Sequence, residues 1–231
     1  MKTSQPIEHA VVMAAGRGLR MRPLTDRIPK AMAPLGESTL IAEGISRLKK
    51  EISNVHITVG YKGAMLASHV IERDVSSVIN TEGEGNAWWL YNSLLSLIDE
   101  PLFVLTCDNV ININFTSFAD EYFDLNAPAC MIIPAYPNED VEGDFIFTNN
   151  SNDILNFSRH QKSSLISSGI QILNPKKINQ ITAKGDTFDE IWQQLIVLEE
   201  IKCSRKVLDS WYSVDDLKQL EEASKQTQRE K

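Results

Sequence analysis

The chain has 231 residues, of which 42% are hydrophobic and 23% are charged, proportions that are ordinary for a globular protein. This length suffices for one α/β domain with a substantial core, whereas two independent domains would be small. The formal net charge of -8 excludes general attraction to nucleic acid. The cysteines, Cys107, Cys130 and Cys203, are far apart, so neither a zinc site nor a disulfide framework is predicted.

The first residues, MKTSQPIEH, contain no apolar core of a signal peptide. No apolar run approaches the roughly eighteen residues that a membrane-spanning helix needs. We therefore expect a cytoplasmic protein without a membrane partner.

Apolar patterning predicts alternating strands and helices up to Pro134. The predicted strands are Ala10 to Met13, Val55 to Gly60, Ser77 to Asn80, Leu102 to Thr106, and Ala129 to Pro134. The predicted helices are Ser38 to Lys50, Tyr61 to Glu72, Asn86 to Ile98, and Phe115 to Leu125. This β-α order favours a mainly parallel sheet that helices cover on both faces.

The pattern changes after Pro134. Short β-prone segments at Asp144 to Thr148, Asp153 to Phe157, and Leu165 to Leu173 favour an antiparallel or mixed extension. A charged helix end is expected from Glu221 to Lys231. We expect one domain over residues 1–231, with a first half at about 1–134 and a second half at about 135–231.

A glycine-rich turn follows the first predicted strand. Gly16 and Gly18 allow the backbone to approach a ligand closely and to present N–H groups to phosphate oxygens, although they would also suit a tight connection alone. Positive charge surrounds the turn, from Arg17, Arg20, Arg22 and Lys30. Since Pro29 restricts the residue before it to an extended conformation, Lys30 is expected in a loop. The segment predicts an enzyme that handles nucleoside triphosphates.

The unbroken string from Gly16 to Lys30 reads G-x-G-x-R-x-x-P-L-T-x-x-x-P-K. It resembles the signature of the sugar-1-phosphate nucleotidyltransferases, including short members that activate N-acetylmuramate 1-phosphate or phosphocholine. Leu19 departs from the small polar residue that is usual in this family. The resemblance implies an α/β, three-layer Rossmann-like nucleotidyltransferase fold, with a mainly parallel mixed sheet and a small antiparallel extension for the acceptor.

The resemblance also implies a nucleotide site. The residues expected to bind the nucleotide are Ala14, Ala15, Gly16, Arg17, Gly18, Glu82, Gly85, Asn86 and Ala87. The last three stand where the family has a Gly-Thr-Ala-like turn that recognises the base. Asn86 is equally suited to be the N-cap of the helix that follows.

Asp108 follows a predicted strand, where the family usually has Gly-Asp and its aspartate binds magnesium. Magnesium is usually held by one or two carboxylates together with phosphate oxygens and water. Asp215, in WYSVDDL, resembles the family's late aspartate, although two residues are missing from the usual pattern and Asp216 is the alternative. All three aspartates would also suit caps of turns or helices. We expect Mg²⁺ on Asp108 and Asp215.

The acceptor region shows the weakest resemblance. The Glu-Lys-Pro motif of the sugar enzymes is absent, and Arg159 and Lys162 precede a predicted strand in which Gly169 leaves room for a substrate. These two cations, Gly169 and Asp108 are the expected acceptor residues. Trp89 joins them as a ring for a quaternary ammonium acceptor, although aromatics at helical spacing more often belong to a core.

The family's reaction is nucleotidyl transfer, in which the acceptor phosphate attacks the α-phosphorus of a nucleoside triphosphate. Arg20 and Lys30 are the expected catalytic residues, acting on the pyrophosphate and the α-phosphate. The partners are a nucleoside triphosphate and a small phosphorylated acceptor, most simply a sugar 1-phosphate; the alternative is a CTP:phosphocholine-type cytidylyltransferase. A metal-dependent glycosyltransferase and a non-catalytic nucleotide-binding module are the competing classes. A homo-oligomer is left open.

Overall fold

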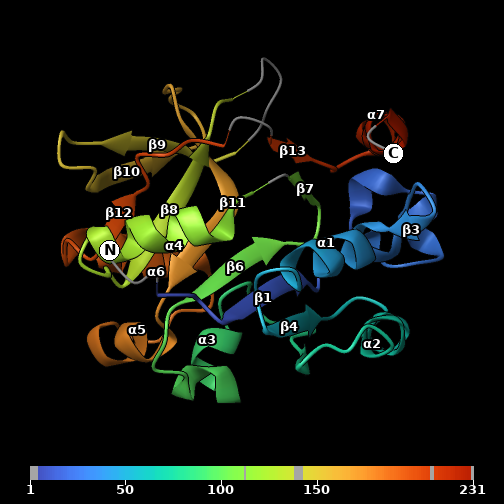
Figure 1. Ribbon diagram of the computed structural model, residues 1–231, viewed down its shortest axis with the longest axis horizontal. Helices are drawn as coiled ribbons and strands as arrows, with labels where there is room; N and C mark the ends of the chain where they lie inside the picture. Colours follow the sequence, from blue (N-terminus) through green and yellow to red (C-terminus); the bar gives the residue numbers. More distant parts are fainter. Residues whose placement is uncertain (1–4, 112, 138–142, 209–210, 230–231) are drawn as a thin grey trace. The chain divides into compact units, whose positions relative to one another are not determined.

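The computed structural model describes residues 5–111, 113–137, 143–208 and 211–229 (Figure 1). The chain divides into two compact units whose segments interleave in the sequence. Unit 1 comprises Met1–Ile7, Gly85–Val104 and Ile113–Ser210, and unit 2 comprises Glu8–Glu84, Leu105–Asn112 and Trp211–Lys231. The expected division into halves near residue 134 stays a prediction.

Unit 2 is built on three parallel strands in the order β5 (Ser77–Asn80), β4 (Asn54–Val59) and β1 (His9–Ala14). Most residues of β1 and β4 are buried, as expected for a parallel sheet that is covered on both faces. The helices of this unit are α1 (Leu40–Leu48), α2 (Gly63–Ile71) and α7 (Leu217–Arg229). Helix α1 begins where the Thr39 hydroxyl accepts a hydrogen bond from the Ala42 backbone N–H.

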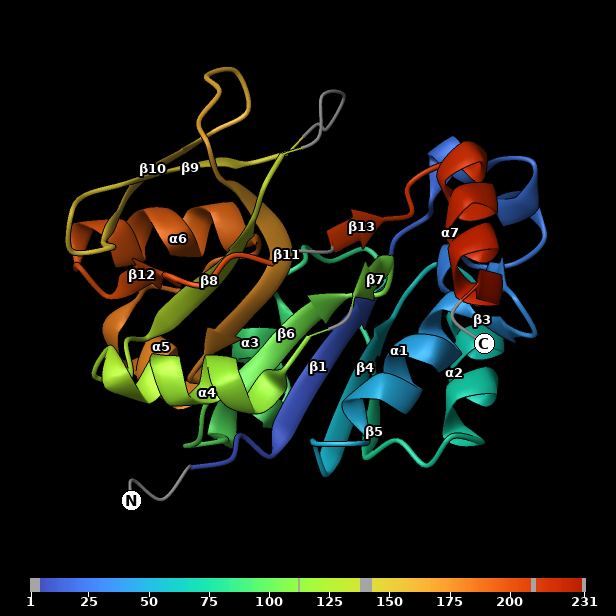
Figure 2. The ribbon, with the colours of Figure 1, turned by 45° about the horizontal axis from the view of Figure 1, so that its top comes forward.

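Short elements fill the rest of unit 2. They are the 3-10 turns η1 (Leu19–Met21), η2 (Leu24–Asp26) and η3 (Lys30–Met32), and the strands β2 (Pro34–Leu35), β3 (Ser38–Thr39), β7 (Asn109–Ile111) and β13 (Trp211–Ser213). Strands β7 and β13 pair antiparallel, with Ser213 opposite Asn109. In Figure 2, α7 (red) stands beside the blue segment that contains these turns, and α7 contacts β2.

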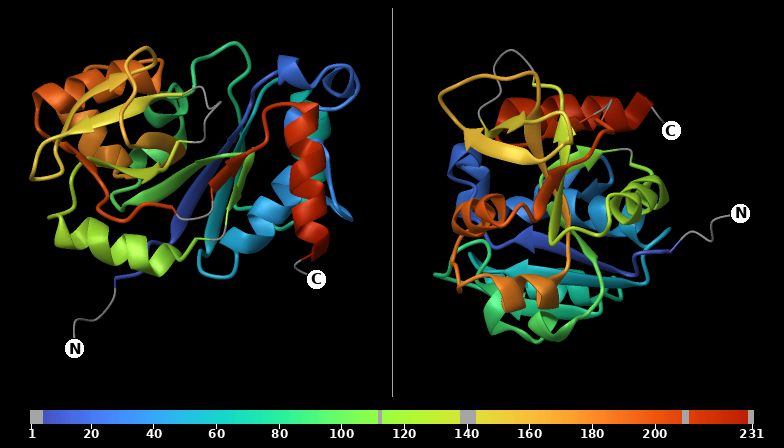
Figure 3. Two further views of the ribbon diagram at one scale, coloured as in Figure 1. Left: turned by 90° about the horizontal axis from the view of Figure 1, so that it is seen from above. Right: turned by 90° about the vertical axis from the view of Figure 1, so that its left-hand side faces the viewer.

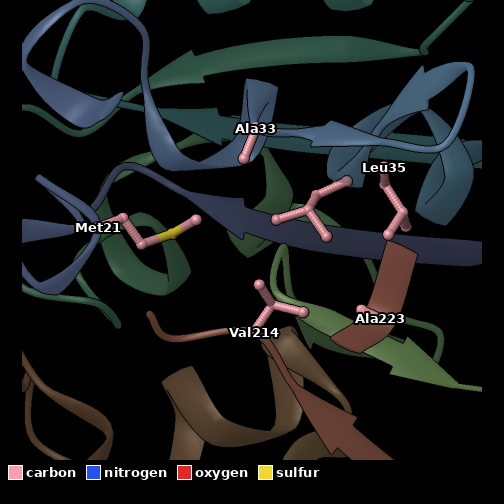
Figure 4. Packing of buried hydrophobic residues seen from close by; sticks show 6 residues of the cluster. Met21, Ala33, Leu35, Val214 and Ala223 are labelled. Atoms are coloured by element: carbon pink, nitrogen blue, oxygen red, sulfur yellow. The ribbon is translucent and has the colours of Figure 1, made fainter. Parts of the chain in front are cut away.

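An apolar cluster joins the start of the chain to its end within unit 2. Its buried members are Met21, Ala33, Leu35, Leu40, Val214 and Ala223, and their side chains gather in one place in Figure 4. Met21 belongs to the glycine-rich segment, Gly16 to Lys30, whereas Val214 immediately precedes Asp215. The cluster therefore fixes the glycine-rich segment against the segment that carries Asp215.

Unit 1 contains antiparallel strands. Its elements are α3 (Trp89–Asn92), η4 (Leu94–Leu97), most of β6 (Leu102–Thr106), α4 (Phe115–Asp124), β8 (Cys130–Ala135), β9 (Phe145–Thr148), β10 (Ile154–Ser158), β11 (Ile166–Leu173), α5 (Pro175–Ile181), α6 (Phe188–Val197) and β12 (Ile201–Cys203). Strand β11 pairs antiparallel with β6, β8 and β9, whereas β12 runs parallel to β8. Figure 3 shows the β9–β10 hairpin (yellow) beside α6 (orange).

These elements confirm the predicted α/β class, with parallel strands and an antiparallel extension. The single helix predicted over Asn86 to Ile98 is wrong, because the chain becomes extended at Ser93, between α3 and η4. The Ser93 hydroxyl accepts from the Leu95 N–H and donates to the Trp89 carbonyl, which satisfies both ends of the break. The segment from Ser38 to Thr39, predicted as helix, forms β3. None of the helices among the described residues is long and apolar enough to cross a membrane.

Candidate active site

The turn after β1 brings Gly18 against Lys30. Gly18 has a positive φ of 61°, and a Cβ atom built there would lie 2.7 Å from the Cβ of Lys30. The Gly18 carbonyl accepts hydrogen bonds from the Thr25 hydroxyl at 2.9 Å and from the Met21 N–H at 3.0 Å. Only glycine combines this backbone conformation with so close an approach. Lys30 is the first residue of the three-residue 3-10 turn η3, directly after the extended Pro29, so it does not lie in a helix interior.

Loop residues after β4 support the same turn. The Tyr61 N–H donates to the Ala15 carbonyl at 3.0 Å, and its hydroxyl donates to the Thr25 carbonyl at 2.9 Å. The guanidinium of Arg17 lies 5.8 Å from the Tyr61 ring centroid, within the range of a cation–π contact. Tyr61 therefore connects the start of the turn, at Ala15, with Thr25.

The four charged side chains of the candidate site meet in unit 2. The Lys30 Nζ atom donates to Asp108 Oδ2 at 2.5 Å and to Asp215 Oδ1 at 2.8 Å. Arg20 Nη2 lies 2.8 Å from the same Asp215 oxygen. The Lys30 side chain is 11% exposed, whereas that of Arg20 is 63% exposed. The sequence prediction named all four residues, and the structure places them together.

Charge pairing governs their protonation. Burial alone would lower the pKa of Lys30, but the neighbouring Asp108 and Asp215 carboxylates outweigh it, so the pKa lies above its usual value. Burial would raise the pKa of Asp215, but Lys30 and Arg20 hold it below its usual value. Burial, followed by the Asp108 charge, raises the pKa of Cys107 to about 12, so this thiol stays neutral. Lys30 and Asp215 are charged near neutral pH.

The β7–β13 ribbon sets the spacing of the two carboxylates. Asp108 immediately precedes β7, and the Val214 N–H donates to the Asp108 carbonyl at 3.0 Å, one residue before Asp215. Asn109 links the ribbon to the end of β6: its amide donates to the Thr106 hydroxyl at 2.8 Å and accepts from Trp211 Nε1 at 3.0 Å. The two aspartates are thus neighbours because the two short strands are paired.

Asp215 and Asp216 have different partners. Asp216 Oδ1 accepts from the Gln219 N–H at 2.8 Å, as an N-cap of α7 does. Gln219 Oε1 in turn accepts from the N–H groups of both aspartates. Asp215 faces Lys30 and Arg20, and Ser213 donates to its other carboxylate oxygen at 3.1 Å.

The expected base-binding turn lies mostly in unit 1. The Gly85 N–H donates to the Asp186 carboxylate and the Ala87 N–H donates to the Asp186 carbonyl, both at 3.0 Å. Asn86 Oδ1 accepts from the Phe188 N–H at 2.9 Å, so this side chain caps the start of α6 and not that of α3. Glu82 lies in unit 2 and is exposed. Contact of these residues with a base stays a prediction.

The expected acceptor residues, apart from Asp108, also lie in unit 1. Arg159 pairs with Asp144, with Nε 2.8 Å from one carboxylate oxygen, and is 67% exposed. Lys162 is exposed. Gly169 does not begin a strand: it lies inside β11 with a φ of 78°, where the pairing with β8 shifts register. Its absent side chain is thus explained by a bulge.

Trp89 has no ring face open to an acceptor. It is 1% exposed, its Nε1 donates to the Asn86 carbonyl, and its ring meets Phe188 edge to face. Packing explains this residue, so the predicted acceptor contact is not supported. Trp89 and Tyr91 belong to the core of unit 1, as the alternative interpretation stated.

Sequence reasoning missed the residues that support the charged cluster. Asn109, Trp211 and Ser213 make the contacts described above, and Met21 anchors the glycine-rich segment in the apolar cluster. In a G-x-G-x-x-G dinucleotide-binding motif that begins at Gly16, the third glycine would stand at position 21. The apolar Met21 at this position was the sequence feature that could have indicated an anchor in the core. The others depend on pairing between strands that are about a hundred residues apart.

The chain belongs to the nucleotidyl transferase family, whose model matches residues 9–230. It is 24% identical over 165 residues to the bifunctional protein GlmU of Methanococcus aeolicus, covering 70% of this chain and 39% of that protein. It is 22% identical over 193 residues to the mannose-1-phosphate guanyltransferase of Debaryomyces hansenii, covering 78% of this chain and 53% of that enzyme. The chain thus spans about half or less of the length of these curated relatives.

Solved structures share the fold. The CTP:phosphocholine cytidylyltransferase LicC of Streptococcus pneumoniae aligns with a TM-score of 0.75 and 19% identity, covering 96% of this chain and all of that one (100%). The inositol-1-phosphate CTP transferase of T. maritima aligns with a TM-score of 0.79 and 16% identity, covering 96% and 97%. The expected Rossmann-like nucleotidyltransferase fold is confirmed.

Proposed function

We propose that this protein transfers a nucleoside monophosphate from a nucleoside triphosphate to a small phosphorylated acceptor, with release of pyrophosphate. The observation that carries the proposal is the meeting of Lys30 and Arg20 with two carboxylates beside the Gly18 turn. A sugar 1-phosphate is the first candidate acceptor, because relatives are named for mannose 1-phosphate and glucose 1-phosphate. A cytoplasmic location stays a prediction.

In this mechanism the side chains hold and neutralise charge. A phosphate monoester is already anionic near pH 7, since its second pKa is about 6, so attack on the α-phosphorus needs no strong general base. Lys30 stabilises the charge that develops on the α-phosphate. Arg20, with the exposed Arg17 assisting, neutralises the departing pyrophosphate. Removal of one such contact typically lowers turnover by about 100- to 1,000-fold.

Asp108 and Asp215 are the residues that would hold Mg²⁺. Their fit is chemical: two carboxylates surround a single cation, the Lys30 ammonium, and carboxylate oxygen is the ligand type that this ion prefers. Among the described residues, no three His, Cys, Asp or Glu side chains are grouped for metal binding. One or two carboxylates are usual for magnesium in such enzymes, with phosphates and water completing the shell. When bound, the ion supplies positive charge to phosphate oxygens.

Pyrophosphate release tests the proposal. Each nucleoside triphosphate is combined with a hexose 1-phosphate, N-acetylmuramate 1-phosphate or phosphocholine, and release is expected only when the right acceptor is present. Lys30→Ala should lower the rate at least about 100-fold, because the cation facing the phosphates is lost.

Lys49→Ala is the matched control for this variant. Lys49 also forms an ion pair with an aspartate, Asp74, but lies at the end of α1. Its replacement should leave the rate unchanged. Wild-type turnover in Lys30→Ala would contradict the mechanism. Release of pyrophosphate without any acceptor would favour a hydrolase.

A further inference from the structure

Lys30 stands where a cation is held by two carboxylates. Its Nζ atom is 2.5 Å from Asp108 Oδ2 and 2.8 Å from Asp215 Oδ1. The ammonium is well buried, and the carboxylate side chains are 17% and 28% exposed. Since both oxygens contact one nitrogen atom, the ammonium occupies the space between them.

Arg20 completes the neutralisation of this pair. Its Nη2 atom lies 2.8 Å from Asp215 Oδ1, the same oxygen that accepts from Lys30. Two carboxylates therefore face two cations, and their charges cancel. A carboxylate oxygen that is shared by an ammonium and a guanidinium has little capacity left for a third cation, because the positive charges repel one another at these distances.

We infer that Lys30 is the resident cation of the Asp108–Asp215 pair in the free protein, so that a divalent cation binds there strongly only once Lys30 has moved to another anion. This inference rests on the proposed function for the identity of that anion, a polyphosphate. The same lysine thus has two partners in turn: the carboxylates before the triphosphate arrives, and the phosphates afterwards. By thermodynamic linkage, binding of the polyphosphate then favours binding of the divalent cation, and binding of the cation favours binding of the polyphosphate.

The alternative is a lysine that only steadies the two carboxylates while metal binds beside it. In that case removing the ammonium would leave metal binding unchanged or would weaken it, because the carboxylates would separate. The two possibilities predict different results for a single variant, tighter metal binding in one case and unchanged or weaker metal binding in the other, which makes them distinguishable without any turnover measurement.

Mn²⁺ titration of the free protein, followed by electron paramagnetic resonance, tests the inference. Lys30→Met keeps the length of the side chain and removes its charge, and it should bind Mn²⁺ at least about tenfold more tightly than the wild type. Adding Asp108→Asn to this variant should abolish the gain. Lys49→Met, which disrupts the ion pair with Asp74, should leave the affinity unchanged. Equal or weaker Mn²⁺ binding by Lys30→Met would overturn the inference.

A second measurement keeps Lys30, so it does not depend on whether Lys30→Met folds. When Lys30 is kept and no substrate is present, Asp108→Asn should change the affinity for Mn²⁺ less than about twofold from the wild type, since Lys30 already occupies the carboxylates. A large loss of tight Mn²⁺ binding in this variant would show that the metal site is open, and would also overturn the inference. Failure of the proposed function is a separate result, because it is the absence of acceptor-dependent pyrophosphate release.

Discussion

Lys30 depends for its position on a residue that has no side chain. Gly18 adopts a left-handed backbone, and its α-carbon lies so near the lysine stem that a Cβ there would be 2.7 Å from Lys30 Cβ and 3.2 Å from Thr25 Cγ2. At Gly16, two residues earlier, a Cβ would meet nothing within 4 Å. The surroundings of the two glycines of the motif thus differ. Gly18 is required by packing, whereas a Cβ at Gly16 would meet open space.

Replacing each glycine by alanine tests this difference. Gly18→Ala should lower the free energy of unfolding by about 1 to 3 kcal/mol, because alanine is strained at a positive φ and its methyl group displaces Lys30 or Thr25. Gly16→Ala should not lower it, since the space is open and φ is not in the left-handed region. Urea denaturation of the free proteins measures both changes. Equal losses in the two variants would show that Gly18 has no special packing role.

At the scale of elements, the β7–β13 ribbon is the part of the site that connects distant sequence. Its strands have three residues each, so few backbone hydrogen bonds hold them. Asn109 adds side-chain contacts at one end, to the Thr106 hydroxyl before it and to Trp211 Nε1 across the ribbon. The ribbon therefore determines how closely Asp108 and Asp215 approach one another.

Asn109→Ala should raise the magnesium concentration that gives half-maximal activity by at least about threefold, because the carboxylate spacing loses both supports. Trp211→Phe removes only one hydrogen bond and keeps the ring, so its effect should be smaller. Circular dichroism checks that both variants are folded. If the magnesium titration of Asn109→Ala matches the wild type, backbone pairing alone sets the spacing.

Across the whole molecule, local sequence patterns predicted many of the strands and helices, whereas most contacts between distant segments were not predicted. Strand β5 and the limits of β6 match the predicted ranges. Strand β6 is an apolar run that is buried except at its last residue, whereas β5 is only partly buried. The members of the charged cluster were predicted separately, Arg20 and Lys30 from the glycine-rich motif, and Asp108 and Asp215 from the resemblance elsewhere in the chain. The direct pairing of Lys30 with both carboxylates was not predicted. The capping of α6 by Asn86 and the packing of Trp89 on Phe188 depend on contacts with residues about a hundred positions along the chain, which helical spacing does not show. The break at Ser93 is local, because the Ser93 hydroxyl bonds to the backbone of Trp89 and Leu95.

The residues expected for the two substrates lie largely in different units. The residues expected to bind the phosphates of the triphosphate and the metal belong to unit 2, whereas Arg159 and Lys162, expected for the acceptor phosphate, belong to unit 1. If Arg159 and Lys162 bind the acceptor phosphate, their loss should affect the acceptor alone. Asp144 pairs with Arg159 and holds the pKa of the guanidinium above its usual value.

Replacing both Arg159 and Lys162 by Ala should raise the acceptor KM about 10- to 100-fold, because two charge-assisted contacts to a phosphate are lost and solvent weakens such contacts at these exposed side chains. The KM for the triphosphate should change less than about twofold. Asp144→Asn is the control: it removes the partner of Arg159 and keeps the cation, so acceptor KM should not rise. Steady-state kinetics with each substrate varied in turn gives both constants. An unchanged acceptor KM in the double variant would place the phosphate pocket elsewhere, and Asp144→Asn behaving like the double variant would mean that the Arg159–Asp144 pair acts as a support for β9 and β10.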